Sequence, residues 1–252
     1  RHTPVTITTL LWIIAAMVSA RAAAMGFNRL VDSRYDALNS RTADREMPRG
    51  VISKRAGAVF VIFSSIIFMA VTFQLSWLCF ILSPVALSLV FWYSLAKRYT
   101  AFTQLFLGLA MAVAPIGGWL AAGGRGGLEP WLLGLAIGAW VAGFDVLYAC
   151  QDFDFDRKYG LRSIPARYGI QAALTISRSM HVIAVTALAS LVMVVPLGVV
   201  YLTGVASVGA LLAYEQSLVK ANDLSRIKQA FDLNGYVGFV YLLVTAVALY
   251  VD

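Results

Sequence analysis

Charge is scarce in this chain of 252 residues, because only 13% of them are Asp, Glu, Lys or Arg. Hydrophobic residues make up 60%, and the mean hydropathy is +0.77. A chain of this length with so little polar surface cannot cover a water-soluble particle. The composition therefore excludes a soluble globular protein and predicts one that lies in a lipid bilayer.

Cysteine and histidine are also scarce, with two of each. Cys79 and Cys150 fall near opposite faces of the membrane in the topology that the apolar stretches predict. An intramolecular disulfide is therefore not expected, and neither spacing resembles a metal site, so we interpret both as packing residues. His2 and His181 have no partner at ligand spacing, and neither is given a role.

Long apolar stretches are abundant, and each is long enough to cross the roughly 30 Å hydrocarbon core of a bilayer. They recur at about residues 7–28, 55–74, 76–95, 101–122, 130–150, 170–192, 196–215 and 235–251. The pattern predicts an all-α fold, a polytopic transmembrane bundle of about eight helices. We expect residues 1–252 to form a single membrane-embedded domain.

Basic residues gather in the connections on one side of this predicted bundle. The segments 29–55, 97–98, 157–178 and 217–230 hold 17 of the 20 Lys and Arg residues. By the positive-inside rule that side is cytoplasmic. The net charge of +7 is therefore explained by topology, and no nucleic-acid partner is expected.

Successive helices cross the membrane in alternate directions, so an even number of helices places both termini on the outer side, with Arg1 and Arg125. The sequence does not begin with Met. We therefore expect that a helix preceding residue 1 is absent. The Gly-rich segment 123–127 lies on the outer side too. It follows no strand, so we expect a turn there rather than a phosphate-binding loop.

Two acidic stripes stand out against the apolar background, each at the cytoplasmic end of a long stretch. At about 100° per helical residue, Asn28, Asp32 and Asp36 fall within roughly 80° of arc. Asp145, Asp152 and Asp156 fall within about 40° on the same basis. Each stripe is followed by a basic loop long enough to hold structure of its own, 37–54 and 153–169, which gives a weak two-fold repeat.

Carboxylate and amide oxygens are ligands that Mg²⁺ accepts, and diphosphate is a natural bridging anion between such ions. Two matched stripes therefore favour a membrane enzyme that handles a metal-bound diphosphate. A single Asp at a helix end is more often an interfacial anchor, and that interpretation is kept for Asp44, Asp223 and Asp232.

Basic and phenolic groups near the stripes are candidates for binding the diphosphate. Lys97 and Arg98 follow one apolar stretch directly, and Arg162 follows the second stripe. Tyr148 shares the face of Asp145 and Asp152 and could donate to a phosphate oxygen. Two alternatives stay open, in which the three basic residues only set the orientation of the helices in the membrane and Tyr148 is an anchor at the membrane interface.

Arg21 lies inside the first apolar stretch, about 10 Å of helix rise before Asn28 and on nearly the same face. A charge at this depth needs a partner. It could bind a carboxylate on an acceptor substrate or form a buried ion pair with Asp145, and the two alternatives stay open.

The segments NRLVDSRYD (28–36) and YACQDFDFDRKYGLRSIP (148–165) resemble the paired signatures of the UbiA superfamily of intramembrane prenyltransferases. The similarity extends over most of the chain. RAAAMGFNR, ALNSRTADREMPRG and YEQSLVKANDLSR further resemble the 4-hydroxybenzoate polyprenyltransferase-like branch. Arg29 departs from the pattern, because many members have Asp after the Asn.

The resemblance implies nine transmembrane helices around a cavity open to the cytoplasm, with two Mg²⁺ ions that bridge an allylic polyprenyl diphosphate above an aromatic acceptor. The implied metal ligands are Asn28, Asp32, Asp36, Asp152 and Asp156. Arg21 is implied in substrate binding, and the segment from Tyr93 to Arg98 in diphosphate binding.

The expected reaction is Mg²⁺-dependent ionisation of the diphosphate to an allylic carbocation, which the ring of 4-hydroxybenzoate or a dihydroxynaphthoate attacks in ubiquinone or menaquinone biosynthesis. Asp145 is the candidate for orienting the ring hydroxyl or taking the ring proton. We expect an integral protein of a prokaryotic inner or plasma membrane, with its site facing the cytoplasm.

A transporter or channel with cation-binding carboxylates is the alternative from another class. Such proteins tend to place coordinating groups in interrupted helices near the bilayer midplane. Here both stripes lie at cytoplasmic helix ends beside long basic loops, so the sequence favours the enzyme.

Overall fold

The computed structural model describes residues 5–251, so Arg1 and His2 lie outside the described part. Eight helices within these residues are long and apolar enough to cross a membrane, which confirms the predicted all-α class and helix number. The helices are α1 (Ile7–Asp36), α2 (Lys54–Leu75), α3 (Trp77–Ala96), α4 (Thr103–Ala121), α5 (Glu129–Ala149), α6 (Phe153–Tyr159), α7 (Ile164–Tyr168), α8 (Ile170–Ser190), α9 (Val199–Ser217) and α10 (Ile227–Val251), with single 3₁₀ turns η1 (Cys150–Asp152) and η2 (Leu191–Met193).

The helices belong to two compact units. The first contains the chain up to Ala96 together with Ile116–Gly126, and the second contains Lys97–Pro115 together with the chain from Gly127 onward. Helix α4 therefore contributes to both units. A single domain over residues 1–252 would require the two units to assemble into one body. That expectation stays a prediction.

Local sequence signals mark where several helices begin and end. The hydroxyl of Thr6 accepts a hydrogen bond from the backbone amide of Thr9 at 3.1 Å, which caps α1, and Ser53 caps α2 in the same way. Such caps satisfy amides that have no partner within the helix. Gly160, at φ +69°, ends α6 in the left-handed conformation that glycine adopts without strain.

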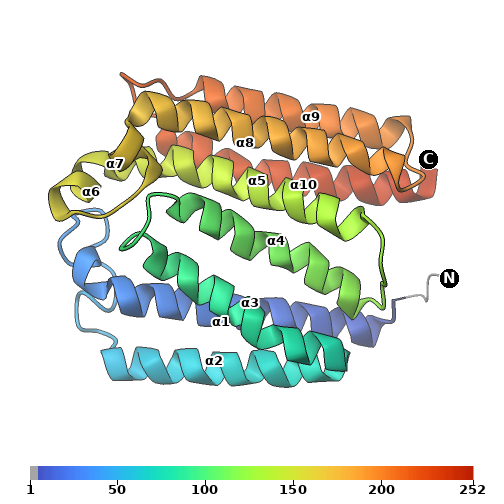
Figure 1. Cartoon of the computed structure of the whole chain (residues 1–252), viewed down its shortest axis with the longest axis horizontal. Helices are drawn as coiled ribbons and strands as arrows, with labels where there is room; N and C mark the ends of the chain where they lie inside the picture. Colours follow the sequence, from blue (N-terminus) through green and yellow to red (C-terminus); the bar gives the residue numbers. More distant parts are fainter. Residues whose placement is uncertain (1–4, 252) are drawn as a thin grey trace. The chain divides into compact units, whose positions relative to one another are not determined.

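In the first unit, α1, α2 and α3 pack against one another (Figure 1). Their buried core consists of Ala16, Ala23, Phe68, Val71 and Leu87. The rings of Phe27 and Phe91 add a contact between α1 and α3, with centroids 4.4 Å apart. This packing holds the C-terminal half of α1, which carries the first acidic stripe.

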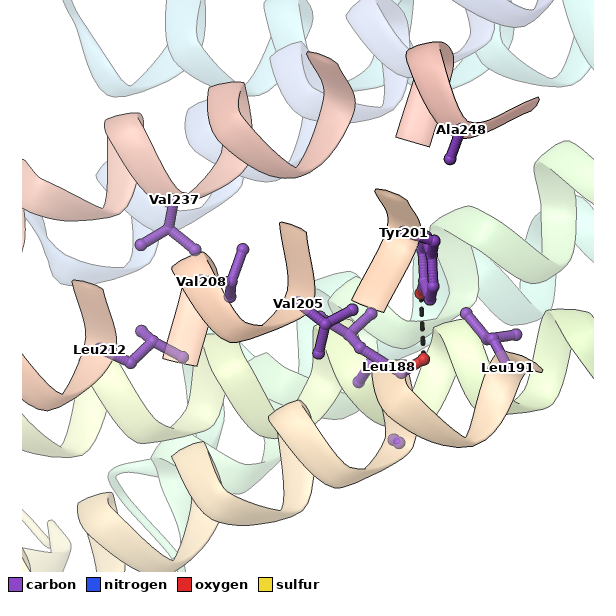
Figure 2. Packing of buried hydrophobic residues seen from close by; sticks show 10 residues of the cluster. Leu188, Leu191, Tyr201, Val205, Val208, Leu212, Val237 and Ala248 are labelled. Atoms are coloured by element: carbon purple, nitrogen blue, oxygen red, sulfur yellow. Dashed lines mark hydrogen bonds between the residues drawn. The ribbon is translucent and has the colours of Figure 1, made fainter. Parts of the chain in front are cut away.

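In the second unit, α5 packs on α8, and α9 packs on both α8 and α10 (Figure 1). Figure 2 shows a buried cluster of this unit, in which Tyr201 of α9 lies among aliphatic side chains and donates to the carbonyl of Leu188 at 3.0 Å. A buried hydroxyl without such a partner would be costly. The core fixes α5, which carries Asp145.

The structure corrects two details of the helix predictions. The last helix begins at Ile227 rather than near residue 235, and Lys228 and Asp232 form an ion pair within its polar first turns. Asn234 accepts a hydrogen bond from the indole of Trp140 at 2.7 Å and donates to the carbonyl of Phe231. The second acidic stripe is also not one continuous helix, because η1 separates α5 from α6 and changes the rise and rotation per residue.

The connecting segments follow the predictions more closely. Segment 153–169 holds α6 and α7, whereas 37–54 forms successive turns, in which the amides of Val51 and Ile52 both donate to the carbonyl of Glu46. Gly123, Gly126 and Gly127 all have positive φ in the segment that follows α4, as expected of a turn. Cys79 and Cys150 are buried free thiols, which confirms their interpretation as packing residues.

Candidate active site

The first acidic stripe lies on the last three turns of α1. Asp32 and Asp36 are buried, and Asn28 is half-buried. The amide nitrogen of Asn28 donates to Asp32 Oδ2 at 3.3 Å and approaches the hydroxyl of Ser94 on α3 at 3.4 Å. Residues four apart on a helix share a face, so these contacts agree with the predicted stripe.

Asp36 ends this stripe and forms an ion pair with Arg45 from the turns that follow. The distance from Arg45 Nη1 to Asp36 Oδ1 is 2.7 Å. The other carboxylate oxygen, Oδ2, is buried and has no hydrogen-bond partner within residues 5–251. A buried anionic oxygen of this kind calls for a cation, and hard oxygen donors suit Mg²⁺.

The second stripe begins on α5 and continues through η1 into α6. Asp145 is half-buried near the end of α5, and the like charge of Asp152 and the opposite charge of Lys97 both act on it. Two carboxylates and a lysine therefore share one electrostatic environment in the second unit. Close carboxylates repel one another unless cations compensate, so this grouping also suits a metal ion.

Asp156 continues the stripe on α6, where its carboxylate is already engaged. The hydroxyl of Ser163 donates to Asp156 Oδ2 at 2.7 Å and also caps α7 by accepting from the amide of Ala166. One serine thus links the last acid of the stripe to the start of α7. The contact fixes the orientation of this carboxylate, as hydrogen-bonded partners do for metal ligands.

Arg162 joins the segment after α3 to the segment after α6. Its backbone amide donates to the carbonyl of Lys97 at 2.8 Å, and its guanidinium donates to the carbonyl of Tyr99. Thr103 in turn donates its hydroxyl to the carbonyl of Arg162 at 3.3 Å. Arg162 therefore holds the segment that begins with Lys97 and Arg98. The predicted contact of Arg162 with the diphosphate would be a second role beside this structural one.

The remaining candidates occupy α1 and α5. Arg21 is an exposed residue of α1. Tyr148 is half-buried at the end of α5, with its ring 4.4 Å from that of Phe231 on α10. Arg29, the departure from the family pattern, is half-buried with its Nη1 buried and without a hydrogen-bond partner in the described structure.

The predicted metal ligands divide between the two units, with Asn28, Asp32 and Asp36 in the first and Asp152 and Asp156 in the second. Among residues 5–251, no three His, Cys, Asp or Glu side chains gather closely enough to hold a metal ion. The oxygen donors within each unit nevertheless have the chemistry that Mg²⁺ requires. The full ligand set stays a prediction.

A buried polar cluster in the second unit was missed by the sequence analysis. Gln216 on α9 donates to the hydroxyl of Ser177 at 2.6 Å and lies 3.1 Å from Nδ1 of His181, both on α8. Ser177 donates to the carbonyl of Gly143 on α5 at 2.7 Å. The four-residue spacing of Ser177 and His181 inside an apolar helix was the available signal, and it gives His181 a packing role.

Comparison with known proteins places the chain among membrane prenyltransferases. The model of the UbiA prenyltransferase family matches residues 1–243. The 4-hydroxybenzoate octaprenyltransferase of Citrobacter koseri is 34% identical over 239 residues, which cover 92% of this chain and 82% of that protein. The protein of the same name from Cronobacter sakazakii is 34% identical, with 92% and 81% covered.

Solved structures have the same fold. The apo structure of a UbiA homolog from Aeropyrum pernix K1 superposes with a TM-score of 0.89 at 33% identity, covering 98% of this chain and 91% of that one. A UbiA homolog from Archaeoglobus fulgidus bound to GPP and Mg²⁺ gives a TM-score of 0.70 at 18% identity, covering 97% and 88%. This second likeness concerns the fold alone.

Proposed function

The chain belongs to the UbiA prenyltransferase family, and from this premise we propose that it transfers a polyprenyl group from an allylic polyprenyl diphosphate to an aromatic acid. Family membership makes the protein a transferase, which selects the enzyme over the transporter or channel. The names of the relatives favour 4-hydroxybenzoate as acceptor. A dihydroxynaphthoate is the second acceptor to be tested.

The observation that supports this function most directly is the grouping of Asp145, Asp152 and Lys97 at the end of a membrane-spanning helix. Carboxylates hold metal ions, and a lysine beside them attracts a phosphate oxygen. An apolar chain that carries this combination can accept a lipid-soluble substrate with an anionic head. We place the site on the cytoplasmic side, because the basic connections gather there.

We assign metal binding to the two acidic stripes, with Asn28, Asp32 and Asp36 from the first and Asp152 and Asp156 from the second. When bound, Mg²⁺ neutralises the charge of the diphosphate and favours its departure. Lys97, Arg98, Arg162 and Tyr148 supply donors to the phosphate oxygens, and they stabilise the negative charge as the bond between carbon and oxygen breaks.

Arg21 and Asp145 are assigned to the acceptor. The guanidinium of Arg21, an exposed residue of α1, would bind the acceptor carboxylate, because this planar fork pairs with carboxylates through two parallel hydrogen bonds. Asp145 would orient the ring hydroxyl or take the proton that the ring loses after the new carbon–carbon bond forms. The apolar walls of the surrounding helices exclude water from the allylic cation.

The deciding experiment is a prenyl-transfer assay in detergent with geranyl diphosphate and either 4-hydroxybenzoate or 1,4-dihydroxy-6-naphthoate, read by mass spectrometry. We expect a prenylated 4-hydroxybenzoate in Mg²⁺ and none in EDTA. Product from the naphthoate alone would change the acceptor, and no product from either acid would refute both proposed acceptors.

Variants test the assigned ligands in the same assay. Asp32→Asn and Asp152→Asn should each lower the rate by roughly 100-fold or more, because each removes a charge that the diphosphate complex needs. Asp232→Asn is the matched control, since Asp232 is exposed and pairs only with Lys228 on α10 in the described structure. A wild-type rate in either of the first two variants would remove that residue from the site.

A further inference from the structure

Two connecting segments of the second unit enclose a pocket of about 600 Å³. One segment joins α3 to α4, and the other runs from the end of α6 into α7. The lining of the pocket includes Tyr99, Phe102, Arg157, Arg167 and Tyr168. Of the proposed substrate and metal contacts, only Asp156 and Arg162 line it.

The pocket walls are held together by specific contacts. Arg162 bonds to the carbonyls of Lys97 and Tyr99 through its backbone amide and its guanidinium, which ties one segment to the other. The rings of Phe102 and Tyr168, one from each segment, lie with centroids 6.0 Å apart. These contacts predict a preformed hollow rather than a gap between two loose loops.

Positive charge dominates the lining, with three arginines against one carboxylate. The carboxylate, Asp156, already accepts a hydrogen bond from Ser163. Arg157 and Arg167 are exposed, and Arg157 lies over the ring of Phe153 at 5.3 Å. The pocket therefore offers guanidinium donors to an anion, and guanidinium pairs well with phosphate oxygens.

The position of the pocket places it at the membrane surface. The first segment joins two membrane-spanning helices, α3 and α4, and the second joins the span that ends at Tyr159 to α8. Tyr99 and Tyr168 are 62% and 49% exposed. Exposed aromatic side chains beside basic residues are typical of the headgroup layer of a bilayer.

An apolar track continues from the pocket along α4. Phe102, Leu105 and Leu109 are all exposed and follow one another at intervals of three and four residues. Such spacing places them on one face of the helix. A ligand with a phosphate in the pocket could therefore lay a hydrocarbon chain along this face.

We propose that this pocket binds a phosphate-bearing anion, supplied by the headgroup of an anionic membrane lipid. Arg157 and Arg167 contact the phosphate, Arg162 closes the wall, and the acyl chains follow the exposed face of α4. Asp156 and Arg162 also belong to the proposed active site, so the inference rests in part on the proposed function, but lipid binding itself requires neither metal nor acceptor. Basic pockets at the cytoplasmic ends of membrane helices are known to hold acidic headgroups.

The test measures lipid binding to the purified protein in detergent by native mass spectrometry, in EDTA to suppress metal-bridged anions. Dioctanoyl phosphatidylglycerol is compared with dioctanoyl phosphatidylcholine, and inorganic diphosphate is titrated separately by calorimetry. The test variant is Arg157→Gln with Arg167→Gln. Its matched control is Lys158→Gln with Arg178→Gln, which removes the same charge from exposed positions outside the pocket lining.

We expect phosphatidylglycerol to bind more tightly than phosphatidylcholine, and the test variant to bind it about 25-fold more weakly than wild type. The estimate takes each arginine near an acidic headgroup to strengthen binding by roughly fivefold. The control should retain wild-type affinity. Diphosphate that binds with the same dependence on Arg157 and Arg167, without lipid binding, would support the anion site with a soluble ligand.

Equal losses in the test and control variants would overturn the proposal, because diffuse surface charge would then explain the binding. Absence of binding by both anions would overturn it too. If the double variant does not fold, Arg167→Gln alone should weaken lipid binding about fivefold. Unchanged affinity in that single variant would count against the pocket.

Discussion

Replacing Gly143 with alanine should destabilise the second unit, because α5 approaches α8 at this glycine without room for a methyl group. A Cβ atom at position 143 would overlap Cδ2 of His181 and lie 2.6 Å from its Nε2 and 3.2 Å from the carbonyl oxygen of Ser177. His181 is buried at 4% exposure and is held by Gln216 at 3.1 Å. The ring therefore cannot move aside without losing that contact.

The expected cost can be built from two terms. Inserting a methyl group into a packed interior typically costs about 1–3 kcal/mol. Losing the hydrogen bond between His181 and Gln216 adds about 1 kcal/mol. The sum of about 2–4 kcal/mol corresponds to a fall in Tm of roughly 5–15 °C for a protein of this size.

The assay is thermal unfolding in detergent followed by circular dichroism, with Gly235→Ala as the matched control. A Cβ at Gly235, within α10, would meet nothing within 4 Å, so this change should be neutral or slightly stabilising. In a His181→Ala background the cost of Gly143→Ala should largely disappear, because the clashing ring is gone. An unchanged Tm in Gly143→Ala, or the same cost in both backgrounds, would refute the packing argument.

Three further changes have distinct expected results. If Arg21 binds the acceptor carboxylate, Arg21→Ala should raise the KM of the aromatic acid far more than that of geranyl diphosphate, and equal effects in steady-state kinetics would favour a structural role. Ser163→Ala should cost about 1 kcal/mol in stability through its lost cap and also lower kcat by releasing Asp156, so a purely thermal effect would contradict the positioning role. Tyr201→Phe should lower the free energy of unfolding by about 0.5–1.5 kcal/mol, because the bond to the carbonyl of Leu188 is lost, with prenyl transfer unchanged.

Helix number and class could be predicted from the sequence because a bilayer imposes a simple rule. Backbone groups inside hydrocarbon must bond within their own segment, so each long apolar stretch has to form a helix. The first acidic stripe could be predicted for a related reason. It lies on one uninterrupted helix, where positions 28 and 32 meet at the regular four-residue interval.

The second stripe could not be placed by the same arithmetic. The turn η1 interrupts the helix between Asp145 and Asp156, and its geometry depends on packing around Cys150, which is buried against α8 and its neighbours. Likewise, the sequence pattern did not predict the hydrogen bond from Ser163 to Asp156, because this contact depends on the left-handed turn at Gly160. Contacts of this kind arise only when the chain reverses direction.

The sequence by itself determined that this protein lies in a membrane, how many helices cross it and which helix ends carry the acids, since hydropathy and charge act locally along the chain. Only the tertiary structure decided that Arg162 ties the segment of Lys97 to that of Asp156, that Gln216 joins Ser177 and His181, and that three arginines line one pocket. These contacts join residues far apart in sequence, and their geometry follows from how helices pack rather than from any local pattern.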